Sequence, residues 1–171
     1  MIIGLSGFAR SGKDTVAEML PNYSRRAFAD KLREAIFRLN PMIEGGMRVQ
    51  EVVNLMGWEK AKVDFAELRR LLQVIGTEVG RQMIDNDLWV KLATENLVAG
   101  DRVVFTDVRF PNEAAMVKAL GGQVWRINRK GVVALNDHAS EHAMTSWNFD
   151  ITIENDGTLD DLHRKVLSAL S

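Results

Sequence analysis

The sequence Gly7-Phe8-Ala9-Arg10-Ser11-Gly12-Lys13-Asp14-Thr15 decides the fold of this chain. It follows an apolar run at residues 1–5, which predicts a buried strand, and precedes residues 16–20, which predict a helix. A glycine-bounded loop that ends in Gly-Lys between a strand and a helix is typical of the phosphate-binding P-loop. Its backbone N–H groups, the positive end of the helix and the lysine all attract phosphate oxygens. The stretch predicts a three-layer α/β P-loop NTPase fold that binds a nucleotide.

The loop departs from the usual motif at Asp14, where serine or threonine normally supplies a hydroxyl ligand to magnesium. Magnesium would then be held by Thr15, through water or by a carboxylate. A plain glycine turn is the alternative, which the strand and helix around the loop disfavour. The loop residues expected to bind the phosphates are Gly7, Ala9, Arg10, Ser11, Gly12, Lys13, Asp14 and Thr15.

Composition limits the class of protein. A length of 171 residues suits one domain, and 46% hydrophobic with 26% charged residues indicates a soluble globular chain. The net charge of -1 argues against a general nucleic-acid binder, and the absence of cysteine excludes disulfides and thiolate metal sites. No apolar run could span a membrane, and the first residues already form a strand. We therefore expect a cytoplasmic protein.

A short second strand is expected within residues 24–29, around residues 26–28, and Asp30 would cap a helix at residues 31–39. Because ligands gather at the carboxyl ends of parallel strands, Asp30 and Lys31 are candidates to face a substrate. The alternative is a plain helix cap followed by a solvated lysine.

Further on, residues 48–56 predict a short helix and residues 57–63 a connection. Asp64 and Glu67 form a capping-box pattern for a helix that continues to about residue 83. Four polar residues recur at every fourth position of this helix: Arg69, Gln73, Thr77 and Arg81. Such a stripe is either a solvated face or a wall that faces a substrate.

A helix at residues 88–99 precedes a buried strand at residues 102–107, which ends in Asp107. Behind a P-loop, a carboxylate there is expected near the magnesium of a bound nucleotide. Arg109 would meet phosphates at the same edge of the sheet. The alternative for Arg109 is a surface ion pair, for example with Glu113 in the next helix, which runs to residue 120.

A fourth strand at residues 123–128 leads into a polar segment at residues 129–147, where P-loop kinases carry a mobile lid. Residues 138–142 also match the H-x-x-E-H zinc-peptidase pattern. Zinc catalysis is disfavoured because it leaves the P-loop unexplained.

A fifth strand at residues 150–154 is followed by a tight turn that contains Asn155, Gly157 and Thr158. This turn would lie beside the P-loop, where it could pack on an adenine base. Alternatively it is only a turn, in which Thr158 or a residue before it caps the last helix, residues 159–170.

Taken together, these segments resemble the phage-type deoxynucleoside monophosphate kinases, in which Gly-Lys-Asp-Thr ends the P-loop. The resemblance spans nearly the whole chain, and the combination of Asp-Val-Arg-Phe-Pro-Asn-Glu with His-Ala-Ser-Glu is its most specific part. The matching segments are residues 7–15, 28–32, 70–73, 76–78 with Arg81, 89–90, 107–113, 137–138 with 140–141, and Asn155 with 157–158.

The resemblance implies a five-stranded parallel sheet of order 2-3-1-4-5, flanked by helices, in a single domain over residues 1–171. An acceptor-binding helical region is expected at about residues 30–99 and a small lid at about residues 129–147. The implied reaction moves the γ-phosphoryl group of ATP, with Mg²⁺, to a deoxynucleoside monophosphate. The resemblance further implies small-molecule nucleotide partners and points to a phage or prophage origin, in which case the protein acts in the host cytoplasm. Nucleic acid and membrane are not expected as partners, because of the composition. The resemblance leaves a homodimer open.

The implied roles follow the motifs. Lys13, Arg10, Arg129 and Asp107 are the catalytic candidates. Magnesium would be held by Asp14, Thr15 or Asp107. The acceptor phosphate would be gripped by Arg109, Arg69 and Lys31, with Asp30 nearby, and the base or sugar touched by Gln73, Glu141 and Trp147. Two other functions stay open at this point: another small-molecule P-loop kinase, such as a dephospho-coenzyme A kinase, and a regulatory module that binds ATP without transferring phosphate.

Overall fold

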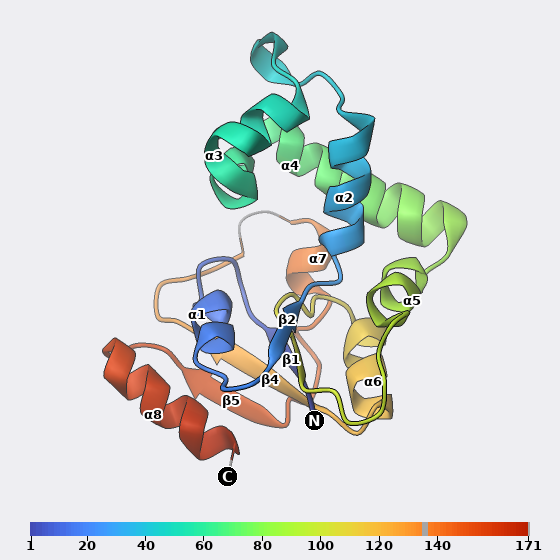
Figure 1. The fold of residues 1–171 in the computed structure, drawn as a ribbon. Helices are drawn as coiled ribbons and strands as arrows, with labels where there is room; N and C mark the ends of the chain where they lie inside the picture. The colour runs from blue at the N-terminus through green and yellow to red at the C-terminus, as the bar shows by residue number, and fades with distance from the viewer. Residues whose placement is uncertain (135–136, 171) are drawn as a thin grey trace. The chain divides into compact units, whose positions relative to one another are not determined.

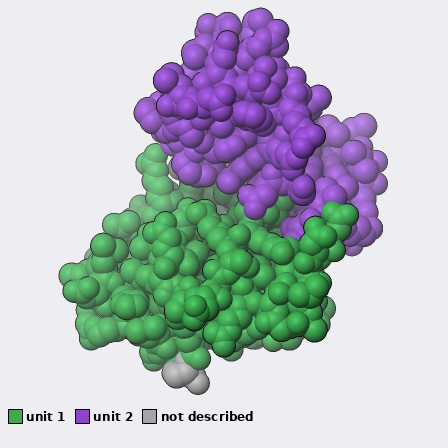
Figure 2. Space-filling model, in the orientation of Figure 1, with its two compact units in different colours: residues 1–28, 94–171 green, residues 29–93 purple. Residues whose placement is uncertain are grey.

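The computed structural model describes residues 1–134 and 137–170. The chain forms two compact units, one made of residues 1–28 and of the chain from Thr94 onward, the other of residues 29–93 (Figure 2). The elements of the first unit are β1 (Ile2–Ser6), α1 (Lys13–Glu18), β2 (Ser24–Arg26), β3 (Val103–Phe105), α6 (Pro111–Ala119), β4 (Gln123–Asn128), α7 (Ala139–His142), β5 (Ile151–Glu154) and α8 (Leu159–Leu170). The second unit holds α2 (Asp30–Leu39), the short 3-10 helix η1 (Glu44–Gly46), α3 (Val49–Asp64), α4 (Ala66–Gln73), the π-helix η2 (Val74–Ile84) and nearly all of α5 (Leu88–Thr94).

The first unit is built on a five-stranded sheet of order β2-β3-β1-β4-β5, which confirms the expected order (Figure 1). All four pairings are parallel, with Ile3 beside Val104 and Ile127 beside Ile153. Because the strands are parallel, their carboxyl ends share one edge. The P-loop after β1, Asp107 after β3 and Asn155 after β5 therefore leave the sheet on the same side.

Helices cover both faces of this sheet. Ile3 and Leu5 of β1 point toward α1 and α8, where they pack in a buried cluster with Val16 and Val166. Gly4 faces the opposite side, where α6 packs so closely that a Cβ atom would lie 3.1 Å from Val117. This alternation of side chains along a strand produces the three layers that were expected.

The second unit is helical. Its helices α2, α3 and α4 contact one another, and their fully or nearly fully buried residues are Leu32, Ile36, Val49, Val52, Ala61 and Leu68. The unit covers nearly the same residues as the region expected at 30–99. None of the helices in the described part of the chain is long and apolar enough to cross a membrane.

Several boundaries differ from the sequence-based expectation. The strand expected around residues 26–28 lies at Ser24–Arg26, and α5 ends at Thr94 rather than near residue 99. The connection expected at residues 57–63 is helical, because α3 continues to Asp64 across a kink at Gly57 (φ 75°, ψ 162°). These values are not helical, so α3 consists of two helical segments that meet at Gly57, where glycine tolerates the positive φ.

The helix expected to run to residue 83 changes type at Val74. The π-helix η2 continues it, with a hydrogen bond of 2.9 Å from the Asp85 N–H to the Gly80 carbonyl, five residues back. The Trp89 indole N–H donates to the Gly76 carbonyl at 2.7 Å, so a side chain takes a carbonyl of this segment. Insertion of a side chain into a helical hydrogen-bond ladder is a known cause of such irregular turns.

The expected Asp64 cap is also wrong. The first N–H groups of α4, those of Ala66 and Glu67, donate to the carboxylate of Glu44 at 2.8 and 3.3 Å. Asp64 instead pairs with Lys60 one turn earlier. A carboxylate at a helix N-terminus is stabilising wherever it comes from in the chain.

Candidate active site

The P-loop needs glycine at both ends. Gly7 and Gly12 have φ values of 149° and 103°, which side-chain-bearing residues rarely adopt. A Cβ atom at Gly7 would lie 2.4 Å from the Ile127 carbonyl oxygen, and one at Gly12 would lie 2.3 Å from the Asn155 amide nitrogen. The loop is therefore packed tightly against the end of β4 and against Asn155, which follows β5.

Between the glycines, the N–H of Ser11 donates to the Phe8 carbonyl at 3.2 Å and closes a turn. Arg10 has a positive φ of 67° and an exposed side chain. Ser11 is 1% exposed, and its hydroxyl is buried without a hydrogen-bond partner among the described residues. A buried polar atom of this kind at a phosphate loop is a natural contact for a ligand oxygen.

Lys13 folds back over the loop. Its ammonium donates to the carbonyls of Gly7 and Phe8, at 2.8 Å each. The pKa of Lys13 is lowered from 10.5 to about 8, first by burial and then by the positive charge of Arg109, while the negative charges of Asp14, Asp107 and Glu141 oppose the shift. Lys13 is thus a poorly solvated cation that a phosphate would stabilise.

Asp107 follows β3 at the same edge of the sheet. Its carboxylate accepts a hydrogen bond of 2.8 Å from the backbone N–H of Phe28. The Phe28 ring stacks on that of Phe105, with 4.7 Å between centroids. These contacts hold Asp107 within electrostatic reach of Lys13, where a carboxylate ligand for magnesium was expected.

Arg109 pairs with Glu141 of α7, at 2.8 Å between Nη1 and Oε1. The alternative, an ion pair between the side chains of Arg109 and Glu113, is wrong, because Glu113 contacts the backbone of Arg109 instead. The Glu113 carboxylate accepts the backbone N–H groups of Arg109 and Phe110, at 2.7 and 3.0 Å, and so caps α6. Proline at the first position and glutamate at the third position of α6 are a sequence signal that would have found this cap.

Asp14 forms an ion pair with Arg25 of β2, and both side chains are about half exposed. Thr15, the next residue on α1, is partly buried. No sequence signal singled out Arg25, because nothing local relates a strand residue to the P-loop helix.

The residues of the H-x-x-E-H segment make contacts within the protein that differ from those of a zinc site. His138 caps the four-residue helix α7 through its Nδ1 atom, which accepts from the Ser140 N–H at 3.2 Å. Glu141 pairs with Arg109, and His142 lies 4.0 Å from Asp137. Among the described residues, no group of three or more His, Cys, Asp or Glu side chains could hold a metal ion. These contacts argue against the zinc-peptidase interpretation.

The turn after β5 holds the P-loop and caps α8. The amide of Asn155 donates to the Ser11 carbonyl at 2.9 Å. The Thr158 hydroxyl accepts from the Asp161 N–H at 3.2 Å, and the Asp161 carboxylate accepts from the Thr158 N–H at 3.0 Å, which makes a capping box. A Cβ atom at Gly157 would lie 2.8 Å from the same carboxylate. Of the caps expected from the sequence, Thr158 or a residue before it, the structure shows Thr158.

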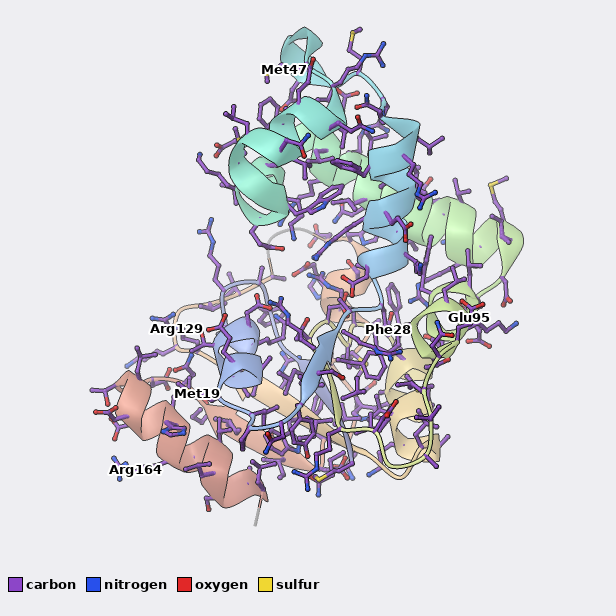
Figure 3. All side chains as sticks on the ribbon, viewed as in Figure 1. Met19, Phe28, Met47, Glu95, Arg129 and Arg164 are labelled. Carbon is purple, nitrogen blue, oxygen red and sulfur yellow. The ribbon has the colours of Figure 1, made fainter. Side chains whose placement is uncertain are left out.

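Two residues of the expected lid, Arg129 and Trp147, make none of the contacts described above. Arg129 is exposed just after β4 (Figure 3), and its carbonyl accepts from the Val132 N–H at 3.1 Å. The indole N–H of Trp147 is buried and has no hydrogen-bond partner in the described part of the chain. Residues 135–136 of the expected lid lie outside the described residues.

The other predicted substrate residues belong to the second unit. Asp30 is the first residue of α2 rather than its cap, which is Ala29, and Lys31 pairs with Glu34 at 3.0 Å. Arg69 and Gln73 lie on α4 and are partly buried. The four-residue polar stripe ends before Arg81. The π-helical turns bury this residue, and its guanidinium donates to the Asn86 carbonyl at 3.0 Å.

Comparison with known proteins identifies relatives. A family model described as deoxynucleotide monophosphate kinase matches residues 45–166. A protein of Acanthamoeba polyphaga mimivirus that carries the same name is 30% identical over 192 residues, which cover 99% of this chain and 96% of the relative. The deoxynucleoside-5'-monophosphate kinase of Escherichia phage T5 is 26% identical over 179 residues, covering 69% of this chain and 72% of the relative.

The deoxynucleotide monophosphate kinase of Escherichia phage RB69 is 32% identical over 108 residues, which cover 60% of this chain but only 44% of that enzyme. The match with the mimivirus protein runs from end to end, and the family model covers well over half of the chain. Together with the P-loop and the sheet order, these matches show that the chain belongs to the deoxynucleotide monophosphate kinase family.

Proposed function

We propose that this protein transfers the γ-phosphoryl group of ATP to a deoxynucleoside monophosphate, giving the deoxynucleoside diphosphate and ADP. The observation that carries the proposal is Lys13, a poorly solvated cation at the head of a glycine-bounded phosphate loop, in a chain of this kinase family. Family membership favours this function over a dephospho-coenzyme A kinase and over a regulatory module without turnover.

On the donor side, the loop N–H groups and Lys13 bind the β- and γ-phosphates. Lys13 then exchanges the carbonyls of Gly7 and Phe8 for phosphate oxygens, which are stronger partners because they are charged. The buried hydroxyl of Ser11 gains a partner in the same step. Gly7, Ala9, Gly12, Asp14 and Thr15 complete the loop, and the turn at Asn155, Gly157 and Thr158 borders the adenine.

Magnesium fits this site through oxygen ligands. Thr15 on α1 and Asp107 after β3 supply the hard oxygen donors that Mg²⁺ prefers, whereas Asp14 is paired with Arg25. Because the described residues contain no cluster of three ligands, phosphates and water would complete the ion's coordination. When bound, magnesium neutralises charge on the β- and γ-phosphates.

The acceptor's phosphate oxygen is already ionised at neutral pH, so transfer requires no strong general base. Positioning and charge neutralisation then carry the reaction. Arg10 and Arg129 are proposed to neutralise the transferred group. Arg69, Lys31 and Asp30 are proposed to hold the acceptor phosphate, with Gln73 and Trp147 at the base or sugar.

A coupled assay of ADP release tests the proposal. ATP and Mg²⁺ are offered with each deoxy- and ribonucleoside monophosphate and with dephospho-coenzyme A, for the wild type and for Lys13→Met. Turnover of at least one deoxynucleotide by the wild type, reduced at least about 100-fold in the variant, supports the proposal. Turnover of dephospho-coenzyme A alone, or of no acceptor while ATP still binds, contradicts it.

A further inference from the structure

Arg109 is held at both ends by carboxylates. Its guanidinium donates to Glu141 at 2.8 Å, and its backbone N–H donates to Glu113 at 2.7 Å. Glu113 also receives the N–H of Phe110, so it fixes two successive residues at the start of α6. The three acidic and basic groups come from two segments 32 residues apart that meet beside the P-loop edge of the sheet.

The two glutamates are buried, whereas Arg109 remains partly accessible. Glu113 is 2% exposed and the Glu141 side chain 6% exposed, whereas Arg109 keeps 37% of its side chain accessible. A buried carboxylate is costly unless it is paired and hydrogen bonded. Glu141 is therefore bound to a protein partner, while the accessible remainder of the Arg109 fork can receive a ligand.

Arg109 also lies close to Lys13. Its charge is the largest electrostatic contribution that lowers the Lys13 pKa, and Glu141 acts on Lys13 in the opposite sense. Two cations this close repel each other until an anion lies between them. A phosphate group is the anion that a P-loop binds, and its oxygens can accept from both side chains.

We propose that Glu141 is a positioning residue that aims Arg109 at the phosphate held by Lys13, and that Glu113 fixes the backbone from which Arg109 extends. This inference rests on the proposed function. It assigns Arg109 to the ATP phosphate held by Lys13 instead of the acceptor phosphate expected from the sequence, and it gives Glu141 a different role from the expected base or sugar contact. Arg109 touches the phosphate, and Glu141 acts only through Arg109.

A double-mutant cycle separates the two roles of Glu141. Glu141→Gln, Arg109→Met and the double variant are compared with the wild type, with kcat and KM measured for ATP and for several deoxynucleoside monophosphates. We expect Glu141→Gln to lower kcat about 10-fold, since a misaimed group near the reacting atoms costs this much or more. The acceptor KM stays within about twofold, and in the Arg109→Met background Glu141→Gln has no further effect.

Binding provides a readout that does not need turnover. In calorimetric titrations with ATP, Glu141→Gln weakens binding about threefold in the wild type and not in Arg109→Met. If the wild type binds ATP and turns over no deoxynucleotide, the proposed function fails, and the binding cycle still decides this inference.

Lys118→Gln is the matched control, because it breaks another ion pair of the same unit, with Asp150 at 2.5 Å. Its kinetics and ATP binding should equal those of the wild type, and thermal melting verifies that every variant is folded. The inference is overturned if Glu141→Gln has the same effect with and without Arg109, or if it raises the acceptor KM by a factor that depends on the base.

Discussion

The side-chain amide of Asn155 donates a hydrogen bond of 2.9 Å to the carbonyl of Ser11, 144 residues earlier in the chain. The same amide occupies the space that a Cβ atom at Gly12 would need. Asn155 follows β5, so the turn at one end of the sheet acts as a support for the phosphate loop at its centre. A residue expected to border the adenine thus also shapes the loop.

Asn155→Ala should weaken ATP binding and stability together. The change removes a partner of the part-buried Ser11 carbonyl, which costs about 1 kcal/mol of unfolding free energy. We expect a several-fold increase in the KM for ATP and an unchanged KM for the acceptor. Urea denaturation and steady-state kinetics measure both effects. Ser24→Ala, which removes an exposed side-chain hydrogen bond to the Arg102 carbonyl, is the control and should leave the KM for ATP unaltered. Equal KM values for ATP in the two variants would contradict the support role.

The pKa of Lys13 predicts a fall of kcat/KM for ATP as the pH rises through about 8. Above that pH the free enzyme carries a neutral amine, which cannot balance phosphate charge. The decline of kcat should come at higher pH, because bound phosphates stabilise the ammonium. Lys13→Arg stays charged and should lose the decline near pH 8. The assignment to Lys13 is wrong if the arginine variant keeps the same profile.

The Lys13 contribution to the unfolding free energy should rise with pH, whereas kcat/KM for ATP should fall. The Lys13 pKa is about 8 when folded and near its ordinary value of 10.5 when unfolded. Between these values the unfolded chain binds more protons, so the Lys13 contribution to the unfolding free energy increases with pH. Chemical denaturation of the wild type and Lys13→Met from pH 7.5 to 10.5, at spacings of about half a unit, measures the difference between them. A constant difference across the range would refute the assigned pKa.

Arg25 should compensate the unusual aspartate of the phosphate loop. Arg25→Ala leaves the Asp14 carboxylate unpaired next to a triphosphate site, and we expect the KM for ATP to rise about 2- to 5-fold, since the pair is exposed. Asp14→Asn removes the charge, so adding Arg25→Ala to it should change nothing further. The four proteins of this cycle are compared by steady-state kinetics at low salt. Additive effects would show that Arg25 acts independently of Asp14.

Gly80 should tolerate no side chain while Trp89 is present. A Cβ atom at Gly80 would lie 2.7 Å from the Trp89 ring, so Gly80→Ala is expected to lower the unfolding free energy by about 1–3 kcal/mol. Gly76→Ala is a matched comparison and should cost less, because its neighbour at 2.8 Å is the flexible end of Leu32. In a Trp89→Leu background, the Gly80→Ala penalty should shrink. Denaturation curves of the full chain measure these values, and an undiminished penalty would mean that Trp89 does not limit the site.

Several differences between prediction and structure concern helix packing in the second unit. The sequence pattern predicts one α-helix up to about residue 83, whereas Trp89 takes the Gly76 carbonyl and the chain continues as a π-helix. This change of helix type turns Arg81 inward, so the expected polar stripe does not extend to it. Helical periodicity assumes 3.6 residues per turn, and it fails where a residue outside the window competes for the backbone.

The sequence by itself determined the phosphate loop, the five strands and their order, and a cap of α8 at Thr158 or a residue before it. These features depend on local patterns and on the family resemblance: apolar runs form buried strands, glycines permit positive φ, and a hydroxyl caps a helix three residues away. Only the tertiary structure decided the partners of the charged groups: Arg109 with Glu141, Asp14 with Arg25, and Glu44 with the start of α4. A charged residue in a sequence is compatible with many partners. The packing of apolar side chains decides which strand and helix ends come together, and therefore which partner the charged residue meets.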